Sequence, residues 1–224
     1  MTLRVVLADD EHLIRSGLRT LLERDGIEVV AEAADGVQAI AFVREYRPDV
    51  ALFDVRMPLL DGIEAAGRLS ADPTVTTRLV ILTTFDDDQT LLRALRAGAA
   101  GYLHKAMPAL QLTAAVRAAA SGDVLLAPRL VQRLLDHRLD TAGRAERAEG
   151  VRALLSPREL DVLLLVATGR NNEEIARDMF VGVATVKTHI SALLSKLGCR
   201  DRVQLVVRAH DSGLVPPRGP AGDI

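Results

Sequence analysis

The stretch "DVALFDVRMPLLDG" at residues 49–62 decides the fold that we predict. Its apolar run, residues 50–53, ends on Asp54, and Met57-Pro58 break the strand pattern just behind it. A buried strand that ends on a carboxylate brings a costly charge to the edge of its sheet. Such a charge is tolerable where water, a cation or a partner meets it, so we expect Asp54 to face one of these.

The composition is that of an ordinary globular protein with one or two domains. The chain has 224 residues, of which 49% are hydrophobic and 26% charged. Its single cysteine, Cys199, excludes an intrachain disulfide and suits a reducing compartment. No apolar run reaches the roughly 18 residues of a membrane span, and the strand pattern leaves no room for a secretory signal. We therefore expect a cytoplasmic protein with no membrane partner.

Charge divides unevenly between the two halves of the chain. Residues 1–125 carry 18 acidic and 13 basic residues, a net charge of -5, and residues 126–224 carry 12 and 15, a net charge of +3. This asymmetry suggests a cation as partner of the front half and nucleic acid as partner of the back half.

The front half alternates short apolar runs with helical periodicity. The runs lie at residues 5–7, 29–30, 50–53, 79–82 and 101–103, and apolar spacings of three and four lie between them at 13–22, 37–43, 91–95 and after the last run at 110–116. Such alternation over about 120 residues predicts a doubly wound α/β fold, a parallel sheet with helices on both faces.

Polar residues follow four of the five predicted strands. Asp9 and Asp10 follow the first, Asp54 the third, Thr83 the fourth and Lys105 the fifth. The carboxyl ends of parallel strands share one edge, where ligands bind in doubly wound sheets. Three carboxylates there would repel one another unless a cation neutralised them, and such hard oxygen ligands suit Mg²⁺.

Residues 1–122 resemble the receiver domain of bacterial two-component response regulators, a flavodoxin-like (βα)5 fold. The resemblance is carried, in order, by "LADDE", "LFDVRMPLLDG", "ILTT" and "AGAAGYLHKA". It implies that Asp54 is the phosphoryl acceptor, that Lys105 contacts the phosphoryl group, and that Thr83 and Tyr102 are switch residues. The resemblance also implies a Mg²⁺ site formed by Asp9, Asp10, Asp54 and the backbone carbonyl of Arg56.

Simpler interpretations exist for each of these residues. Asp9 and Asp10 could cap a helix that starts near Glu11, and Asp54 could be a turn residue. Lys105 taken alone would be a surface lysine, and Tyr102 could serve core packing. Asp86, Asp87 and Asp88 suit the opening of the next helix. His104 stands where the family usually has an aliphatic residue, and we assign it no role.

The middle of the chain is predicted to join two domains. Pro128 can open a helix with an apolar face at Leu130, Val131, Leu134 and Leu135. Residues 140–150 are small and charged without an apolar face, which is typical of a flexible linker. We therefore predict a receiver domain at 1–122, a linker with one helix at 123–150, a second domain at 151–215 and a tail at 216–224.

The second domain is predicted to contain four helices, at 157–168, 172–180, 183–197 and 202–211. Capping boxes open three of them, at Ser156 with Glu159, Asn171 with Glu174, and Asp201 with Gln204. The turn between the second and third helices is short, as a helix-turn-helix requires.

The third of these helices has the pattern of a DNA-reading helix. Val186, Ile190, Leu193 and Leu197 mark its core face, and no acidic residue lies between 184 and 200. Such a helix can lie in a major groove without repelling phosphates, although an ordinary solvated face is the plain alternative. We expect bases to be read by Lys187 and Thr188. The full set of expected DNA contacts is Thr185, Lys187, Thr188, His189, Ser191 and Lys196.

Residues 155–215 resemble the LuxR-type helix-turn-helix domain, through "SPRELDVL", "EEIA", "ATVKTHIS" and "LLSKLGCRDRVQLV". Gly182, Val183 and Glu173 depart from the usual family residues. With the receiver in front, the chain resembles the NarL/FixJ response regulators. This implies a transcription factor, not an enzyme, whose partners are a sensor histidine kinase, double-stranded DNA and a second copy on activation.

One surface and two rival functions complete the predictions. The apolar stripe of the last helix, at Val203, Val206, Val207 and His210, suits a dimer contact. One rival is an atypical regulator that acts without phosphorylation. The other is an aspartyl phosphatase, a class that needs a second acid two residues after the nucleophile, where Arg56 stands here.

Overall fold

The computed structural model describes residues 2–84, 87–122 and 144–215. The chain divides into two compact units, Met1–Val124 (unit 1) and Leu125–Ile224 (unit 2), and each is described by itself. None of the helices within these described ranges is long and apolar enough to cross a membrane.

Unit 1 is built on a parallel sheet of five strands in the order β2-β1-β3-β4-β5. All five predicted strands are confirmed, and the order reverses direction beside β1, as in a doubly wound fold. The strands are β1 (Arg4–Ala8), β2 (Glu28–Ala33), β3 (Val50–Asp54), β4 (Arg78–Thr83) and β5 (Gly101–His104).

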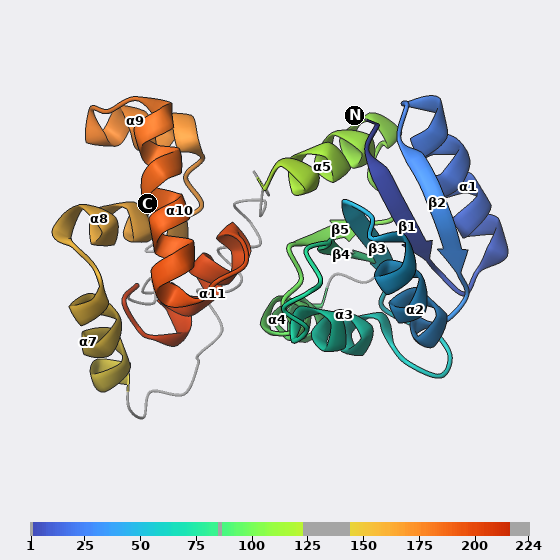
Figure 1. Cartoon of the computed structure of the whole chain (residues 1–224), viewed down its shortest axis with the longest axis horizontal. Helices are drawn as coiled ribbons and strands as arrows, with labels where there is room; N and C mark the ends of the chain where they lie inside the picture. The colour runs from blue at the N-terminus through green and yellow to red at the C-terminus, as the bar shows by residue number, and fades with distance from the viewer. Residues whose placement is uncertain (1, 85–86, 123–143, 216–224) are drawn as a thin grey trace, which may run out of the picture. The chain divides into compact units, whose positions relative to one another are not determined.

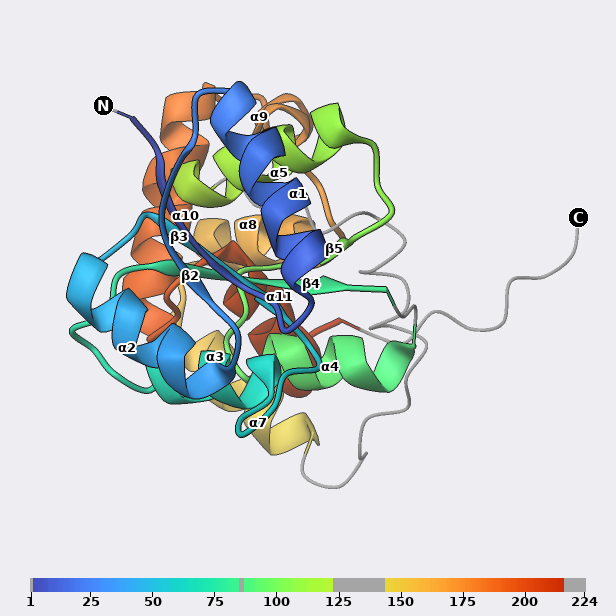
Figure 2. The same ribbon diagram turned by 90° about the vertical axis from the view of Figure 1, so that its right-hand side faces the viewer.

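Helices cover both faces of this sheet (Figures 1 and 2). α1 (His12–Arg24) and α5 (Ala109–Ser121) lie on one face, and α2 (Gly36–Tyr46), α3 (Gly62–Ser70) and α4 (Asp88–Arg96) lie on the other. The periodicity of α3 was not among those singled out in the sequence, because alanines supply much of its buried face. Ile63, Ala66 and Leu69 nevertheless pack inward.

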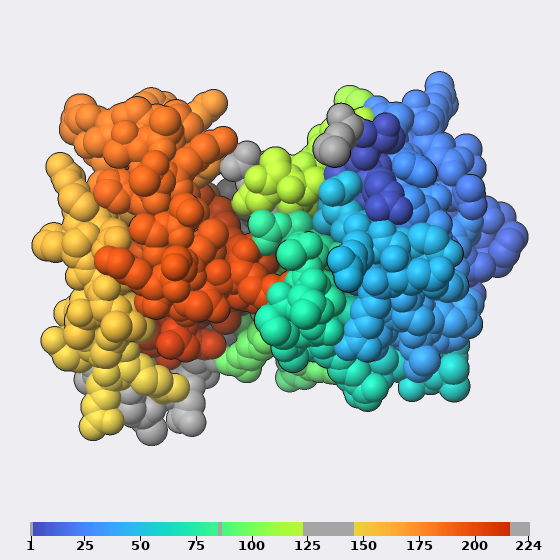
Figure 3. Space-filling model, viewed as in Figure 1, coloured from blue at the N-terminus to red at the C-terminus, as the bar shows by residue number. Residues whose placement is uncertain are grey.

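The core of unit 1 explains why its central strands are continuously apolar. Every residue of β3 is buried, and Leu52 and Phe53 lie opposite Leu7 and Ala8 of β1. A strand covered by helices on both faces has no solvent side to keep polar. Side chains fill the spaces that the ribbons leave open within each unit (Figure 3).

Unit 2 is helical, and its four predicted helices are confirmed to within one residue at their ends. Its described helices are α7 (Arg144–Leu154), α8 (Pro157–Ala167), α9 (Asn172–Met179), α10 (Val183–Leu197) and α11 (Arg202–Asp211). The predicted helix that begins at Pro128 and the predicted tail at 216–224 lie outside the described residues.

The flexible linker predicted at 140–150 is wrong from residue 144 onward, because α7 occupies that segment. Alanine, arginine and glutamate are good helix formers even where they make no apolar stripe. Val151, which lies just past the predicted linker, is buried and gives the helix an anchor. The domain boundaries themselves stay a prediction.

Two of the three predicted capping boxes are confirmed, those of Ser156 with Glu159 and of Asn171 with Glu174. Of the third predicted box, only one of the two reciprocal hydrogen bonds is present. Asp201 accepts the backbone N–H of Gln204 at 3.0 Å, but the Gln204 side chain accepts the N–H of Arg200 at 2.7 Å instead of that of Asp201.

Candidate functional site

The polar residues that follow the strands of unit 1 converge at one edge of the sheet. Asp9 follows β1, Asp54 and Thr83 end β3 and β4, and Lys105 follows β5. Asp54 is 8% exposed and Thr83 is fully buried, whereas Asp10 is exposed. The sheet therefore gathers side chains that lie up to 96 residues apart in the sequence.

Lys105 lies between two buried carboxylates. Its ammonium is 2.7 Å from Asp9 Oδ2 and 2.9 Å from Asp54 Oδ1. Only 8% of the lysine side chain is exposed. The interpretation of Lys105 as an ordinary surface lysine is therefore wrong, because its charge is held inside the acidic edge.

Burial and charge pull the ionisation of this pair in different directions. Burial raises the pKa of Asp54 above its ordinary value, and the hydrogen bond from Lys105 opposes but does not cancel the rise. Burial alone lowers the pKa of Lys105, but its hydrogen bonds to Asp9 and Asp54 outweigh burial and raise the pKa. Burial thus disfavours the charged form of Asp54 even with the lysine in place.

The donor set fits a hard divalent cation. Oxygens of Asp9, Asp10 and Asp54 lie within 4.8 Å of one another. Asp9 Oδ2 is buried, and the partner that the described residues give it is the ammonium of Lys105, at 2.7 Å. Carboxylate oxygens with spare lone pairs and uncompensated charge are the ligands that Mg²⁺ accepts.

The capping interpretation of Asp9 and Asp10 is wrong. α1 starts after Glu11, which makes no side-chain cap bond, and Asp9 Oδ1 instead accepts the N–H of Glu11 at 3.0 Å. Asp87 does cap α4, accepting the N–H of Thr90 at 2.7 Å, and Asp88 lies in its first turn. Asp86 lies outside the described residues.

Tyr102 and Arg56 occupy different surroundings at this edge. Tyr102 is buried on β5, opposite Ile81 of β4. Arg56 is exposed in the loop that joins β3 to α3, two residues beyond Asp54.

Gly62 is a residue of the site that the sequence reasoning missed. A Cβ atom at Gly62 would lie 1.9 Å from the carbonyl oxygen of Asp54, and the Gly62 N–H donates to Val55 O at 3.0 Å. The backbone at the start of α3 therefore packs directly against the end of β3, which carries Asp54. The signal was available, since this glycine ends the stretch that we quoted first.

Most of the side chains that we expect to contact DNA are exposed on α10. Along α10, Val186, Leu193 and Leu197 are buried, whereas Thr185, Lys187, Thr188 and Ser191 are exposed and His189 is half-buried. Thr188 Oγ1 donates to Ala184 O at 3.1 Å, so its methyl group and lone pairs remain the parts that can meet a base.

Lys196 has a partner inside the protein. Its ammonium lies 2.7 Å from Glu159 Oε2, a carboxylate that also accepts the N–H of Ser156 in the capping box of α8. A phosphate contact would have to compete with this ion pair. The DNA contact expected of Lys196 stays a prediction, and this ion pair opposes it.

The prediction that the apolar stripe of α11 is exposed for a dimer contact is wrong. Val203, Val206 and His210 are buried, and His210 Nε2 lies 3.1 Å from the carbonyl oxygen of Ala167 at the end of α8. α11 packs against α8 and α10, so this stripe belongs to the core of unit 2.

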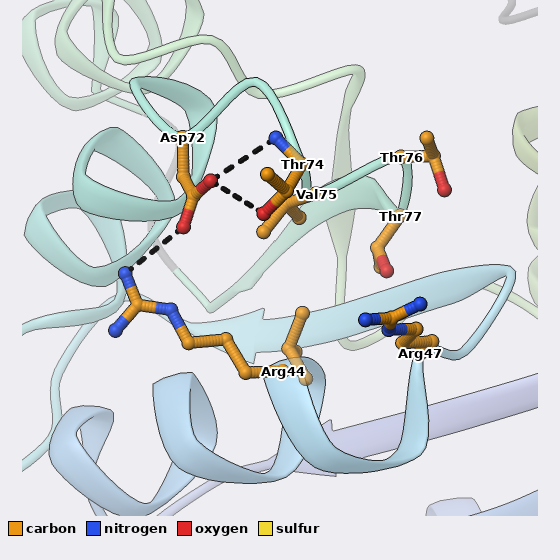
Figure 4. A pocket seen from close by; sticks show the side chains of 8 residues that line it. Arg44, Arg47, Asp72, Thr74, Val75, Thr76 and Thr77 are labelled. Atoms are coloured by element: carbon orange, nitrogen blue, oxygen red, sulfur yellow. Dashed lines mark hydrogen bonds and ion pairs between the residues drawn. The ribbon is translucent and has the colours of Figure 1, made fainter.

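A polar pocket of about 200 Å³ lies between the end of α2 and the segment that precedes β4 (Figure 4). There Arg44 pairs with Asp72 at 3.2 Å, and Thr74 donates to Asp72 from its N–H and its hydroxyl. The bonds from Thr74, and then that from Arg44, lower the pKa of Asp72. Because Asp72 already engages Arg44 and Thr74, we assign the pocket a structural role.

An acidic edge that clasps a buried lysine, in a chain that also carries a helix-turn-helix, defines a DNA-binding regulator with a receiver-type signalling domain. The family described as "Response regulator receiver domain" matches residues 5–117, and that described as "Bacterial regulatory proteins, luxR family" matches residues 153–209. The chain belongs to the two-component response regulators that join a receiver domain to a LuxR-type DNA-binding domain.

Relatives match along nearly the whole chain. The transcriptional regulatory protein LiaR of Bacillus subtilis (strain 168) is 38% identical over 217 residues, which cover 95% of this chain and 99% of that protein. The response regulator protein VraR of Staphylococcus aureus (strain Mu3 / ATCC 700698) is 37% identical over 217 residues, covering 96% and 100%. These relatives are regulators, and the chain is accordingly a regulator, not an enzyme.

Solved structures agree with the fold. The response regulator ChrA of a heme-sensing two-component system is 35% identical with a TM-score of 0.51, covering 96% of this chain and 99% of that chain. A LuxR-family two-component response regulator from Aurantimonas sp. SI85-9A1 is 34% identical with a TM-score of 0.56, covering 62% and 100%.

Proposed function

We propose that a sensor histidine kinase phosphorylates this regulator on Asp54, and that phosphorylation controls dimerisation and promoter binding. The observation that carries the proposal is the ammonium of Lys105 between Asp9 and Asp54, at 2.7 and 2.9 Å. The ammonium holds a compensating positive charge beside Asp54, the carboxylate that must approach an anionic phosphoryl donor. Since the kinase's phosphohistidine and the promoter are met in the cytoplasm, we expect the protein to act there.

Asp9, Asp10, Asp54 and the backbone carbonyl of Arg56 would hold Mg²⁺ at this edge. The ion supplies charge neutralisation and alignment of the phosphoryl group. Asp54 contributes the attacking oxygen, so an O–P bond forms as the N–P bond of the donor's phosphohistidine breaks. Lys105 contributes the fixed positive charge that meets the phosphoryl oxygens.

The transferred group changes the balance of charge at the edge. It adds roughly -1.5 to -2 charges and three acceptor oxygens, by analogy with other phosphorylated side chains. Thr83 ends the neighbouring strand and supplies a hydroxyl that can reach these oxygens, and Tyr102 is the buried ring one strand further on. We propose that their rearrangement transmits the signal.

On DNA, we propose that Lys187 and Thr188 read bases and that Thr185, His189 and Ser191 contact the backbone. These side chains are exposed on α10, apart from the half-buried His189, and the helix has no acidic residue, and both observations support the assignment. Two copies on a near-palindromic site would place their α10 helices about one turn of DNA apart.

Mass measurement tests the proposal directly. Wild-type protein incubated with Mg²⁺ and acetyl phosphate should gain the mass of one phosphoryl group, and Asp54→Asn should gain none. A wild type that gains no mass, yet binds its DNA as tightly as Asp54→Asn does, would establish the phosphorylation-independent alternative. The phosphatase alternative is disfavoured by Arg56, which stands where that class needs an acid.

A further inference from the structure

His104 links the two strand ends that carry Thr83 and Lys105. It is the last residue of β5 and lies opposite Thr83 of β4 in the register of the sheet. Its Nε2 lies 3.1 Å from the carbonyl oxygen of Thr84, and its Nδ1 lies 3.1 Å from the backbone nitrogen of Ala106. One imidazole therefore contacts the residue that follows Thr83 and the residue that follows Lys105.

The two contacts require one protonation state of the ring. The backbone nitrogen of Ala106 can only donate, so Nδ1 must accept with a free lone pair. The carbonyl of Thr84 can only accept, so Nε2 must carry the hydrogen. Only the neutral Nε2–H tautomer satisfies both partners, because a doubly protonated ring would direct an N–H group at another N–H group.

Backbone bonds make the same two segments a single unit. Lys105 N–H donates to Thr83 O at 2.7 Å, and Met107 N–H donates to His104 O at 3.0 Å, which closes the turn that contains Lys105. The His104 ring adds two side-chain hydrogen bonds to the same two segments. An aliphatic residue at position 104 could make neither of its two bonds.

We propose that His104 is a positioning residue, whose neutral Nε2–H imidazole ties the Thr83-Thr84 segment to the Lys105-Ala106 turn and so holds the lysine ammonium toward Asp9 and Asp54. This inference rests on the proposed function, because the lysine matters to phosphoryl transfer at Asp54. His104 itself touches neither the acceptor nor the metal ligands in any contact given by the structure.

The first test needs no phosphorylation. Long-range ¹⁵N–¹H correlation spectra of the full-length wild type at neutral pH should show His104 with a protonated Nε2 and an unprotonated Nδ1. A ring in the Nδ1–H tautomer, or one averaging between tautomers as a solvent-exposed histidine does, overturns the inference even if Asp54 is phosphorylated.

The second test separates the two hydrogen bonds. In His104→Asn the side-chain oxygen stands near the position of Nδ1 and can accept from Ala106, and in His104→Gln the amide nitrogen can reach toward Thr84. His104→Leu removes both bonds. His12→Gln is the matched control, because His12 is exposed in unit 1 and takes no part in these contacts.

The readout is the initial rate of Mg²⁺-dependent phosphorylation by acetyl phosphate, measured by mass. We expect His104→Leu to lower the rate about fivefold, the effect of a lost hydrogen bond on a barrier. The Asn and Gln variants should each recover part of this loss, and His12→Gln should match the wild type. Equal rates for His104→Leu and wild type, or Asn and Gln variants no faster than Leu, overturn the inference. A wild type that is not labelled at all contradicts the proposed function instead.

Discussion

The ammonium of Lys196 lies 2.7 Å from Oε2 of Glu159 and joins the last turn of α10 to the first turn of α8. The same carboxylate accepts the backbone N–H of Ser156 at 2.8 Å. The residue that looks most like a phosphate contact from its charge and position is thus engaged in an ion pair within unit 2.

This pairing predicts different roles for two lysines of α10. Lys187→Ala should weaken DNA binding about tenfold, in line with the 1–3 kcal/mol of a base-reading contact. Lys196→Ala should change affinity less than about twofold, since the ion pair already engages its charge. Fluorescence anisotropy with a selected promoter fragment measures both. Equal losses of DNA affinity in the two variants would show that Lys196 contacts DNA despite its ion pair.

The ion pair also predicts a dependence of stability on pH. The hydrogen bond from Lys196, followed by those from Ser156, lowers the pKa of Glu159 to about 2 from its ordinary value of 4.5. The depressed pKa means that the folded state resists protonation of Glu159. The stability that the ionised Glu159 contributes to the fold is therefore complete above about pH 4.5 and is lost as the pH falls toward about 2. A carboxyl NMR titration should place the midpoint of Glu159 near pH 2. Glu159→Gln should abolish the part of the acid-induced loss of folding stability that Glu159 causes.

Two aspartates of unit 1 should respond to amidation with opposite signs. Since burial raises the pKa of Asp54, its charge opposes folding at pH 7, and Asp54→Asn should raise the unfolding temperature. Asp72 has a lowered pKa, since Thr74 and Arg44 favour its ionised form, so Asp72→Asn should lower the unfolding temperature. Calorimetry at pH 7 compares the two, and a lower midpoint for Asp54→Asn would contradict the burial argument.

Gly62 should tolerate no side chain. Gly62→Ala would bring a Cβ to 1.9 Å from the Asp54 carbonyl oxygen, so the loop must shift at a cost of about 1–3 kcal/mol and phosphorylation should slow. Gly17→Ala is the matched control. It lies within α1 with no atom within 4 Å of the added Cβ, and should stabilise by about 0.5–1 kcal/mol. Denaturant titration of both variants should therefore give shifts of opposite sign.

The amino-acid sequence by itself determined which segments become strands and helices in unit 1, apart from α3, and it determined α8–α11 of unit 2. Apolar runs, helical spacing and the capping residues Ser156 and Asn171 act over a few neighbouring residues, so they can be followed along the chain. It also placed Asp9, Asp54, Thr83 and Lys105 at one sheet edge, since parallel strands all end on the same side.

Only the tertiary structure decided which of these groups contact one another. Lys105 lies between Asp9 and Asp54, Lys196 turns to Glu159, and the stripe of α11 is buried instead of exposed. It also gave His104 its two partners, and it made a helix of the segment we had predicted to be a linker. These outcomes depend on packing between segments distant in the sequence, and no local pattern of residues records the direction in which a long side chain finally points.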